Sequence, residues 1–336
     1  MSYSVTPESF DSLTSYWQDP SNKLKWGSVF ILPAWLEVWW RHFQPATELY
    51  LLAVREDSQI IGIAPLQVKD GKASFVGSAD VCDYLDFVIV PGREKDFFSA
   101  LLDDLKKKGI TSLELNPLRP DSTVMTVLLD MAKGVGYETS CQQEAVSLEL
   151  DLPKTWEEYL NRLSKKQRHE VRRKLRRLAE EGDASYRCVK PEGDPGGYMD
   201  AFVRLFTLSK KEEKARFMSN NMETYFRSLA AAMAKIGILR FGILEVGKEP
   251  TAIIMGFDHN DTMYLYNSAY DPKYDYLSVG LLSKILCIKE SIESGRKTWD
   301  FLKGGERYKY DTGGNEIPIS NCRIILKVRL SKGESK

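Results

Sequence analysis

The sequence predicts an α/β protein of the α+β kind, in which two related units each place helices on a mostly antiparallel mixed sheet. The chain has 336 residues, more than one average domain needs for its core. Apolar segments typical of strands occur in two groups, and each group contains an amphipathic helix. Both groups show the order strand, strand, strand, helix, strand, which suggests two units of similar architecture.

Hydrophobic periodicity and turn residues place the elements of each group. Tryptophans Trp35, Trp39 and Trp40 are predicted to lie in the core on an earlier helix. In the first group we predict strands at 48–55, 60–68, 84–90 and 111–115 and a helix at 94–107. In the second group we predict strands at 238–246, 251–257, 262–269 and 297–302 and a helix at 279–294, capped by Gly295.

The junction between the units is predicted near Leu152, which gives one unit at 1–152 and a second at 153–330. Thr155 with Glu158, and then Ser164 with Gln167, have the spacing of capping boxes, so a short helix and a second helix should follow each other. The second helix is strongly basic. Its cations are Lys165, Lys166, Arg168, Arg172, Arg173, Lys174, Arg176 and Arg177.

The basic helix has two interpretations that its spacing does not separate: a solvated surface face, or a site for anions. Over the whole chain 47 basic residues balance 47 acidic ones, which argues against general attraction to nucleic acid or membrane. No apolar run is long enough for a membrane span, and the N-terminus lacks the pattern of a secretory signal, so we expect a cytoplasmic protein. Five scattered cysteines predict isolated buried thiols, and three scattered histidines give no support for a metal site.

The richest chemical pattern is Tyr264–Gly280, where a strand, a polar loop and the start of a helix follow one another. The first turn of a helix has unpaired N–H groups, and a glycine there lets a ligand approach the backbone. Ser278-Val279-Gly280-Leu281 is therefore a candidate site for a phosphate-bearing ligand, although on these residues alone a simple N-cap at Ser278 is the preferred explanation. A second pattern is Trp299–Gly313, where Gly304 and Gly305 end a strand and cations and tyrosines follow.

Together these segments resemble the GNAT acetyltransferase fold. Ser278-x-Gly280-Leu-Leu, Asn267-Ser-Ala-Tyr-Asp-Pro and Phe301–Lys309 are similar to the acetyltransferase domain of cellulose-biosynthesis CelD-like proteins, relatives of the FemAB-type double-GNAT transferases. Leu163–Arg168 with Arg172-Arg173 resembles the start of the second unit in both groups, and Gly77 with Asp83-Tyr-Leu-Asp86 echoes the first unit.

The resemblance implies transfer of an acyl group from acetyl-CoA or another acyl-CoA to an amine of a small molecule, sugar or envelope precursor, without a metal. It implies donor binding by Ser278, Val279, Gly280, Leu281 and Asn267; catalysis by Lys303, Glu306, Tyr308 and Lys309; and acceptor binding by Tyr84, Asp86, Arg168, Arg172, Tyr270 and Asp271. A structural hydrogen-bond network explains Tyr84 and Asp86 as well, and an exposed turn with solvated charges explains the groups after Gly305.

Three other interpretations stay open. Residues 198–235 are too short and broken for the long helical hairpin of relatives that use aminoacyl-tRNA, so acyl-CoA is the preferred donor, with tRNA as the alternative. A nucleic-acid-binding module would use the basic helix and would show steep salt dependence. A non-catalytic accessory protein of polysaccharide synthesis would keep the fold and lose donor binding.

Overall fold

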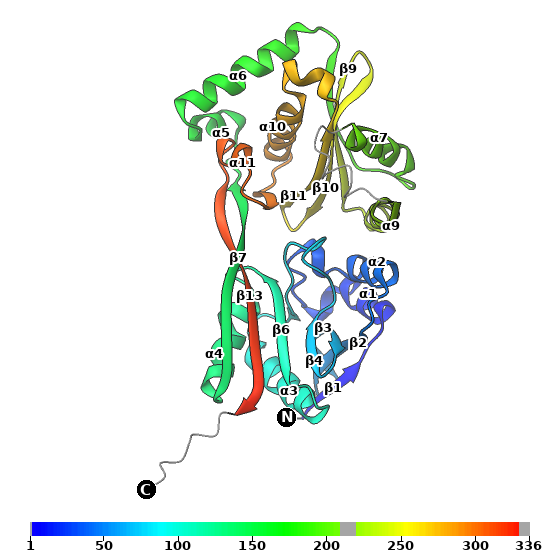
Figure 1. Cartoon of the computed structure of the whole chain (residues 1–336), viewed down its shortest axis with the longest axis vertical. Helices are drawn as coiled ribbons and strands as arrows, with labels where there is room; N and C mark the ends of the chain where they lie inside the picture. The colour runs from blue at the N-terminus through cyan, green and yellow to red at the C-terminus, as the bar shows by residue number, and fades with distance from the viewer. Residues whose placement is uncertain (1, 209–219, 329–336) are drawn as a thin grey trace. The chain divides into compact units, whose positions relative to one another are not determined.

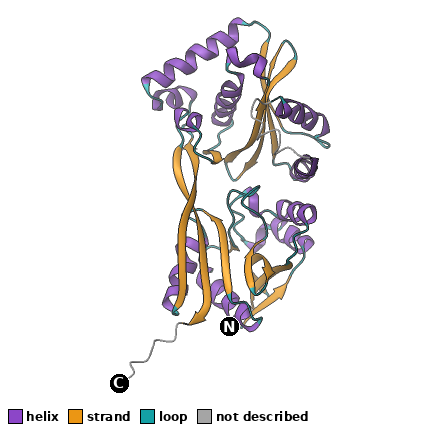
Figure 2. Ribbon diagram, viewed as in Figure 1, coloured by secondary structure: helices purple, strands orange, loops and turns teal. Residues whose placement is uncertain are grey.

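The computed structural model of the chain describes residues 2–208 and 220–328 and divides into two compact units. Unit 1 comprises Met1–Ala145 and the chain from Ile317 onward, and unit 2 comprises Val146–Glu316. Two long strands, β7 (Tyr137–Asp151) and β13 (Asn315–Val328), contribute residues to both units. Figure 2 shows that each unit combines sheet and helices, as the sequence predicts.

Unit 1 has the strand order β1-β2-β3-β4-β6-β13-β7, with β5 paired to β3. Its aromatic core includes Phe75, Phe87, Phe97 and Phe98, all nearly inaccessible to solvent. The remaining elements of unit 1 are β1 (Tyr3–Pro7), α1 (Phe10–Gln18), η1 (Pro20–Asn22), η2 (Val29–Ile31), α2 (Pro33–Phe43), β2 (Glu48–Glu56), β3 (Gln59–Lys69), β4 (Lys72–Phe75), β5 (Val88–Ile89), α3 (Glu94–Lys107), β6 (Ser112–Leu118), η3 (Val124–Leu128) and α4 (Leu129–Gly134).

Unit 2 continues with the order β7-β12-β11-β10-β9-β8. Helix α10 packs on one face of this sheet, while α7 and α9 cover the other (Figure 1). The elements of unit 2 are α5 (Trp156–Arg162), α6 (Lys165–Glu180), β8 (Ala184–Val189), α7 (Gly196–Thr207), α9 (Asn220–Lys235), β9 (Leu239–Val246), β10 (Glu249–His259), β11 (Thr262–Tyr270), η4 (Pro272–Leu277), α10 (Val279–Glu293), β12 (Thr298–Lys303) and α11 (Arg307–Asp311). The predicted break in 198–235 falls partly on residues 209–219, outside the described chain.

Both units share one arrangement, although the strand that takes the third place in unit 1 is β4 and not the predicted 84–90. In each unit a strand that precedes the central helix pairs in parallel with the strand after that helix: β4 with β6, with the short β5 between β4 and α3 in the sequence, and β11 with β12. The β11–β12 pairing ends at Tyr264 and Asp300, although β11 runs on to Tyr270 and β12 to Lys303. The later halves of these two parallel strands therefore separate.

Two predictions fail in unit 1. The strand expected at 84–90 is mostly loop, since only Val88–Ile89 forms a strand and the Asp86 carboxylate takes the Phe87 N–H that a neighbouring strand would need. The prediction of isolated thiols is wrong for Cys141 and Cys322, which form a disulfide across 181 residues of sequence. These cysteines meet because β7 and β13 are neighbouring strands, which the spacing in the sequence does not reveal.

Candidate functional site

Unit 2 contains a crevice of about 300 Å³ that lies between α6, the first turns of α10, and α11. Apolar side chains such as Leu281 and Ile285 line it together with charged groups, a combination typical of ligand sites. This unit 2 crevice is lined by Ser164, Lys166, Gln167, Glu170, Val171, Lys174, Leu281, Ile285, Arg307, Tyr308, Asp311 and Thr312.

The basic helix α6 makes hydrogen bonds to α11 and to the segment that leads into α10. A full capping box of Ser164 and Gln167 starts the helix, as predicted, and the Gln167 amide also donates to Asp311 at 2.9 Å. Lys174 donates to the Ser278 hydroxyl at 2.6 Å, and Arg177 donates to the Tyr276 carbonyl at 2.8 Å. Sequence reasoning did not select Lys174 as a site residue, although its place beside the apolar stripe of α6 was the available signal.

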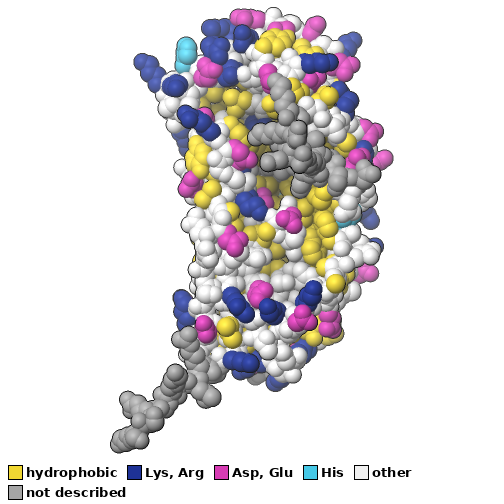
Figure 3. Space-filling view, viewed as in Figure 1, with side chains coloured by type: hydrophobic (Ala, Val, Ile, Leu, Met, Phe, Trp, Pro, Cys, Tyr) yellow, Lys and Arg dark blue, Asp and Glu magenta, His cyan; other side chains and the backbone are white. Residues whose placement is uncertain are grey.

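Most of the other α6 cations have partners on the surface of unit 2 itself. Arg168 donates to Asn161, and Arg172 forms an ion pair with Glu157 at 3.1 Å. Arg173 and Lys174 share Glu170, and hydrogen bonds from Arg173 hold the pKa of that carboxyl down at about 2. In Figure 3 the dark blue side chains gather at the upper left, where Figure 1 places α6. These contacts favour the interpretation of α6 as a surface helix whose cations are held by partners within unit 2.

The start of α10 differs from a simple open phosphate site. A Cβ added to Gly280 would lie 2.7 Å from the Tyr270 ring, so this glycine makes room for a side chain of the protein. Ser278 has a left-handed backbone (φ 58°) and makes no side-chain cap, because its hydroxyl accepts from Lys174. Val279 is fully buried, which leaves Leu281 as the predicted donor-site residue that lines the crevice.

Three further predicted residues lie on the separated part of β11 and just after it. Asn267 is on β11 beyond the split, and its side chain accepts from the Ser268 N–H. Tyr270 ends the strand against Gly280, and Asp271 caps η4 by accepting from the Lys273 N–H. Asp271 therefore has a local structural role.

Lys309, on the short helix α11 that follows β12, has its ammonium turned inward. The residue is 2% exposed, and Nζ donates to the carbonyls of Leu302, Lys303 and Gly304 at 2.9, 2.8 and 3.0 Å. Glu306 lies 2.9 Å from the same ammonium. Because its ammonium hydrogens point at these carbonyls, Lys309 stabilises the backbone conformation of residues 302–304. Lys303 and Glu306 are more accessible to solvent.

Tyr308 lines the crevice next to Lys309. Burial raises the pKa of its phenol, so the hydroxyl stays protonated at neutral pH. The buried Lys284 ammonium lies 5.1 Å from the centre of the Tyr308 ring and donates to the Gly280 carbonyl at 2.7 Å. Lys284 thus connects the start of α10 to α11, and it was not found from the sequence.

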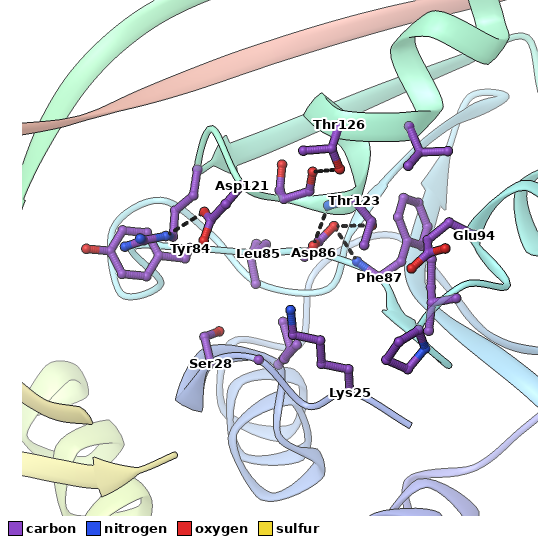
Figure 4. A pocket seen from close by; sticks show the side chains of 17 residues that line it. Lys25, Ser28, Tyr84, Leu85, Asp86, Phe87, Glu94, Asp121, Thr123 and Thr126 are labelled. Atoms are coloured by element: carbon purple, nitrogen blue, oxygen red, sulfur yellow. Dashed lines mark hydrogen bonds and ion pairs between the residues drawn. The ribbon is translucent and has the colours of Figure 1, made fainter. Parts of the chain in front are cut away.

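Unit 1 has a separate pocket of about 280 Å³ that contains Tyr84 and Asp86 (Figure 4). Tyr84 is 3% exposed, and the Arg119 guanidinium lies 4.9 Å from its ring centre. Arg119 is held by Asp121 at 2.9 Å. Figure 4 shows Lys25 pointing from the opposite wall toward the side that carries Leu85 and Asp86. Tyr84 therefore mainly forms part of the pocket wall. The polar groups that face the pocket include Lys25 and Arg119.

Asp86 forms part of a hydrogen-bond network. Its carboxylate accepts from the Thr123 N–H at 2.8 Å, the Thr123 hydroxyl at 2.6 Å and the Phe87 N–H at 2.9 Å. Burial nevertheless outweighs these donors and raises the pKa of Asp86 from 3.8 to about 6.

The geometry of unit 2, with separated parallel strands and a crevice beside the helix between them, agrees with the family comparison. Residues 165–310 match the model of the acetyltransferase (GNAT) domain. The chain carries a GNAT domain and is an acyltransferase. No curated protein matches the sequence significantly.

Solved structures share the fold over most of the chain. FemX has a TM-score of 0.66 and 13% identity, and the match covers 95% of this chain and 96% of FemX. A conserved protein of unknown function from Bacteroides thetaiotaomicron has a TM-score of 0.57 and 13% identity, with coverage of 96% and 99%. L-PGS from Bacillus licheniformis has a TM-score of 0.50 and 12% identity, with coverage of 78% and 80%. At these identities the similarity establishes the fold alone.

The described residues contain no cluster of three or more His, Cys, Asp or Glu side chains arranged to hold a metal ion. Among the helices at 2–208 and 220–328, none combines the length and the apolar character that crossing a membrane requires.

Proposed function

We propose that this acyltransferase moves an acyl group from an acyl-CoA, such as acetyl-CoA, to an amine of a small molecule, a sugar or a cell-envelope precursor. The observation that carries the proposal is the unit 2 crevice, which lies between α6, α10 and α11, in a unit whose parallel strands β11 and β12 stop pairing after Tyr264 and Asp300. An extended thioester arm fits a narrow crevice with apolar walls, and Lys166, Lys174 and Arg307 supply positive charge for its phosphates. The motifs that resemble CelD-like proteins favour a sugar or envelope precursor as acceptor.

The reaction needs no covalent enzyme intermediate. The amine nitrogen attacks the thioester carbonyl, a C–N bond forms, the C–S bond breaks, and the amine proton passes to a base while the thiolate gains a proton. Glu306, with a 57% exposed side chain, is the proposed base. Tyr308 is the proposed acid for the thiolate, since burial keeps its hydroxyl protonated.

The acceptor is proposed to use the unit 1 pocket. Lys25 and Arg119 can bind an anionic part of the acceptor, while Asp121 and Glu94 can bind a positive or hydroxyl part. Asp86 contributes by holding the segment that carries Thr123 in place.

Calorimetry with acetyl-CoA, longer acyl-CoAs and aminoacyl-tRNA tests the donor. We expect an acyl-CoA to bind, Leu281→Trp to abolish that binding by filling the crevice, and Leu286→Trp on the same helix outside the crevice lining to leave it intact. Binding of aminoacyl-tRNA alone would replace acyl-CoA as the donor. Failure of every donor to bind would refute the proposed function.

A transfer assay then tests the acid. Tyr308→Phe should lower the rate of acyl transfer by about 10²- to 10⁴-fold if the hydroxyl protonates the leaving group. Tyr310→Phe is the matched control, because Tyr310 is exposed on the same short helix and donates to Glu316. Equal rates for Tyr308→Phe and the wild-type protein would remove Tyr308 from the mechanism.

A further inference from the structure

Two of the three free cysteines lie together in unit 2. Cys188 is half-buried on β8, the edge strand of the sheet in this unit, and Cys287 is fully buried in the middle of α10. Helix α10 packs against β8, so these two cysteines, far apart in the sequence, come from neighbouring elements. The third free cysteine, Cys82, belongs to unit 1.

Strand β9 leaves room for this pair at Gly242. In the antiparallel pairing of β8 with β9, Cys188 lies directly opposite Gly242. A Cβ added to Gly242 would lie 3.5 Å from Cys287 Sγ and 2.7 Å from the Tyr186 hydroxyl, so both groups extend over this glycine. Side chains two residues apart on one strand point to the same face of a sheet. Cys188 therefore points toward α10, as Tyr186 does.

The two thiols are in contact. Cys188 and Cys287 share a side-chain hydrogen bond, and the Glu290 carboxylate on α10 also interacts with Cys188. The hydrogen bond to Cys287, together with burial, raises the pKa of the Cys188 thiol. Because the thiolate is the reactive form, oxidation of this pair should be slow at neutral pH. The chain already holds one disulfide between neighbouring elements, the bond that joins β7 to β13.

A small pocket gives access to Cys188 from solvent. Its volume is about 120 Å³, which admits a molecule of a few atoms, such as hydrogen peroxide, because one water occupies about 30 Å³. Cys287 lies behind the lining of this pocket, so an oxidant that enters meets Cys188 first. The lining includes Cys188, Arg240, Arg296, Glu290, Ser291 and Ser294.

We propose that Cys188 and Cys287 are a modification site, at which a small peroxide converts the two thiols into a disulfide that joins α10 to β8. The Cys188 thiolate attacks one peroxide oxygen, an S–O bond forms, the O–O bond breaks, and the leaving hydroxide takes up the thiol proton as water. The Cys287 sulfur then attacks the Cys188 sulfur, an S–S bond forms, and the S–O bond breaks. The hydroxyl leaves with the Cys287 proton as a second water. The sulfurs are oxidised and the peroxide is reduced.

Peptide mapping of the full-length protein tests the site. After treatment with hydrogen peroxide and blocking of free thiols, a tryptic digest without reductant should contain the peptides Cys188–Arg204 and Ile285–Lys289 joined by a disulfide. The free thiols should fall from three to one, that of Cys82. Cys82→Ser is the matched control and should form the same link. Cysteines 188 and 287 that stay unlinked, or a Cys188 oxidised alone to sulfinic acid, would overturn the inference.

Urea unfolding shows whether the bond fits the native fold. Oxidised wild-type protein should have a higher urea midpoint than untreated protein, because the bond closes a long loop of the unfolded chain. Cys287→Ala with the same peroxide treatment should show no increase, and this control also accounts for oxidation of methionines. An unchanged or lower midpoint in the oxidised wild-type protein would mean that the bond distorts unit 2, and the inference would be wrong.

The half-buried position offers a second control. If Cys287→Ala does not fold, Cys188→Ser takes its place in the unfolding experiment, since Cys188 is the more exposed member of the pair. Neither measurement involves a donor or an acceptor. The inference therefore stands or fails independently of the proposed acyl transfer.

Discussion

Asp86 in the unit 1 pocket makes a quantitative prediction about pH and stability. Burial raises its pKa in the folded protein from 3.8 to about 6. Between these values the folded state holds a proton that the unfolded state has lost, so the free energy of unfolding should fall as pH rises from about 4 to 6 and then level off. A shift of about two units corresponds to about 3 kcal/mol, which is an upper value because the side chain keeps some contact with water.

Two measurements test this. In wild-type protein, the ¹³C signal of the Asp86 carboxyl, assigned by its absence in Asp86→Asn, should titrate with a midpoint near pH 6. Urea unfolding of both proteins in the same buffers should show that the wild-type protein loses stability relative to Asp86→Asn as pH rises from 4 to 6. A midpoint below 4, or a relative gain in stability with rising pH, would mean that the three hydrogen bonds outweigh burial, and the reasoning would be refuted.

Three further changes have clear expected outcomes. Gly280→Ala should displace the Tyr270 ring and cost about 1 kcal/mol in thermal or urea unfolding, with donor binding retained; loss of acetyl-CoA binding at unchanged stability would instead place the ligand at Gly280. Ser164→Ala should cost about 1 kcal/mol of unfolding free energy by removing the capping box of α6, and an unchanged urea midpoint would contradict this. Cys141→Ser, or reduction of the wild-type protein, should lower stability by about 2 to 5 kcal/mol, because the disulfide closes a loop of 181 residues; identical melting with and without reductant would argue against the bond.

The sequence predicted those helices and strands whose ends carry capping or turn residues, or whose apolar residues repeat with a clear period. The helix at 94–107 and the start of α6 at Ser164 follow from apolar spacing and capping residues alone. The four-residue strand β4 is too short to show a period, and the loop containing Asp86 was read as strand because its apolar residues mask a carboxylate that bonds Thr123. The crevice could not be predicted, because it depends on contacts such as Lys174 with Ser278, 104 residues apart.

The two units differ where their paired parallel strands end, and this difference is the reason we propose the donor site in unit 2. In unit 1, as in unit 2, only three residue pairs join the parallel strands around the central helix, here β4 and β6. The chain after β4 then returns to β6: the Leu85 N–H donates to the Pro117 carbonyl at 2.9 Å, beyond the last paired residue Glu114. In unit 1, backbone of the same unit therefore occupies the place where the parallel strands β4 and β6 stop pairing. In unit 2 the chain after β11 instead forms η4 and is fastened to α6, and the crevice beside α10 stays open. A shared architecture therefore supports two different sites, because the segment between the third strand and the helix takes a different path in each unit.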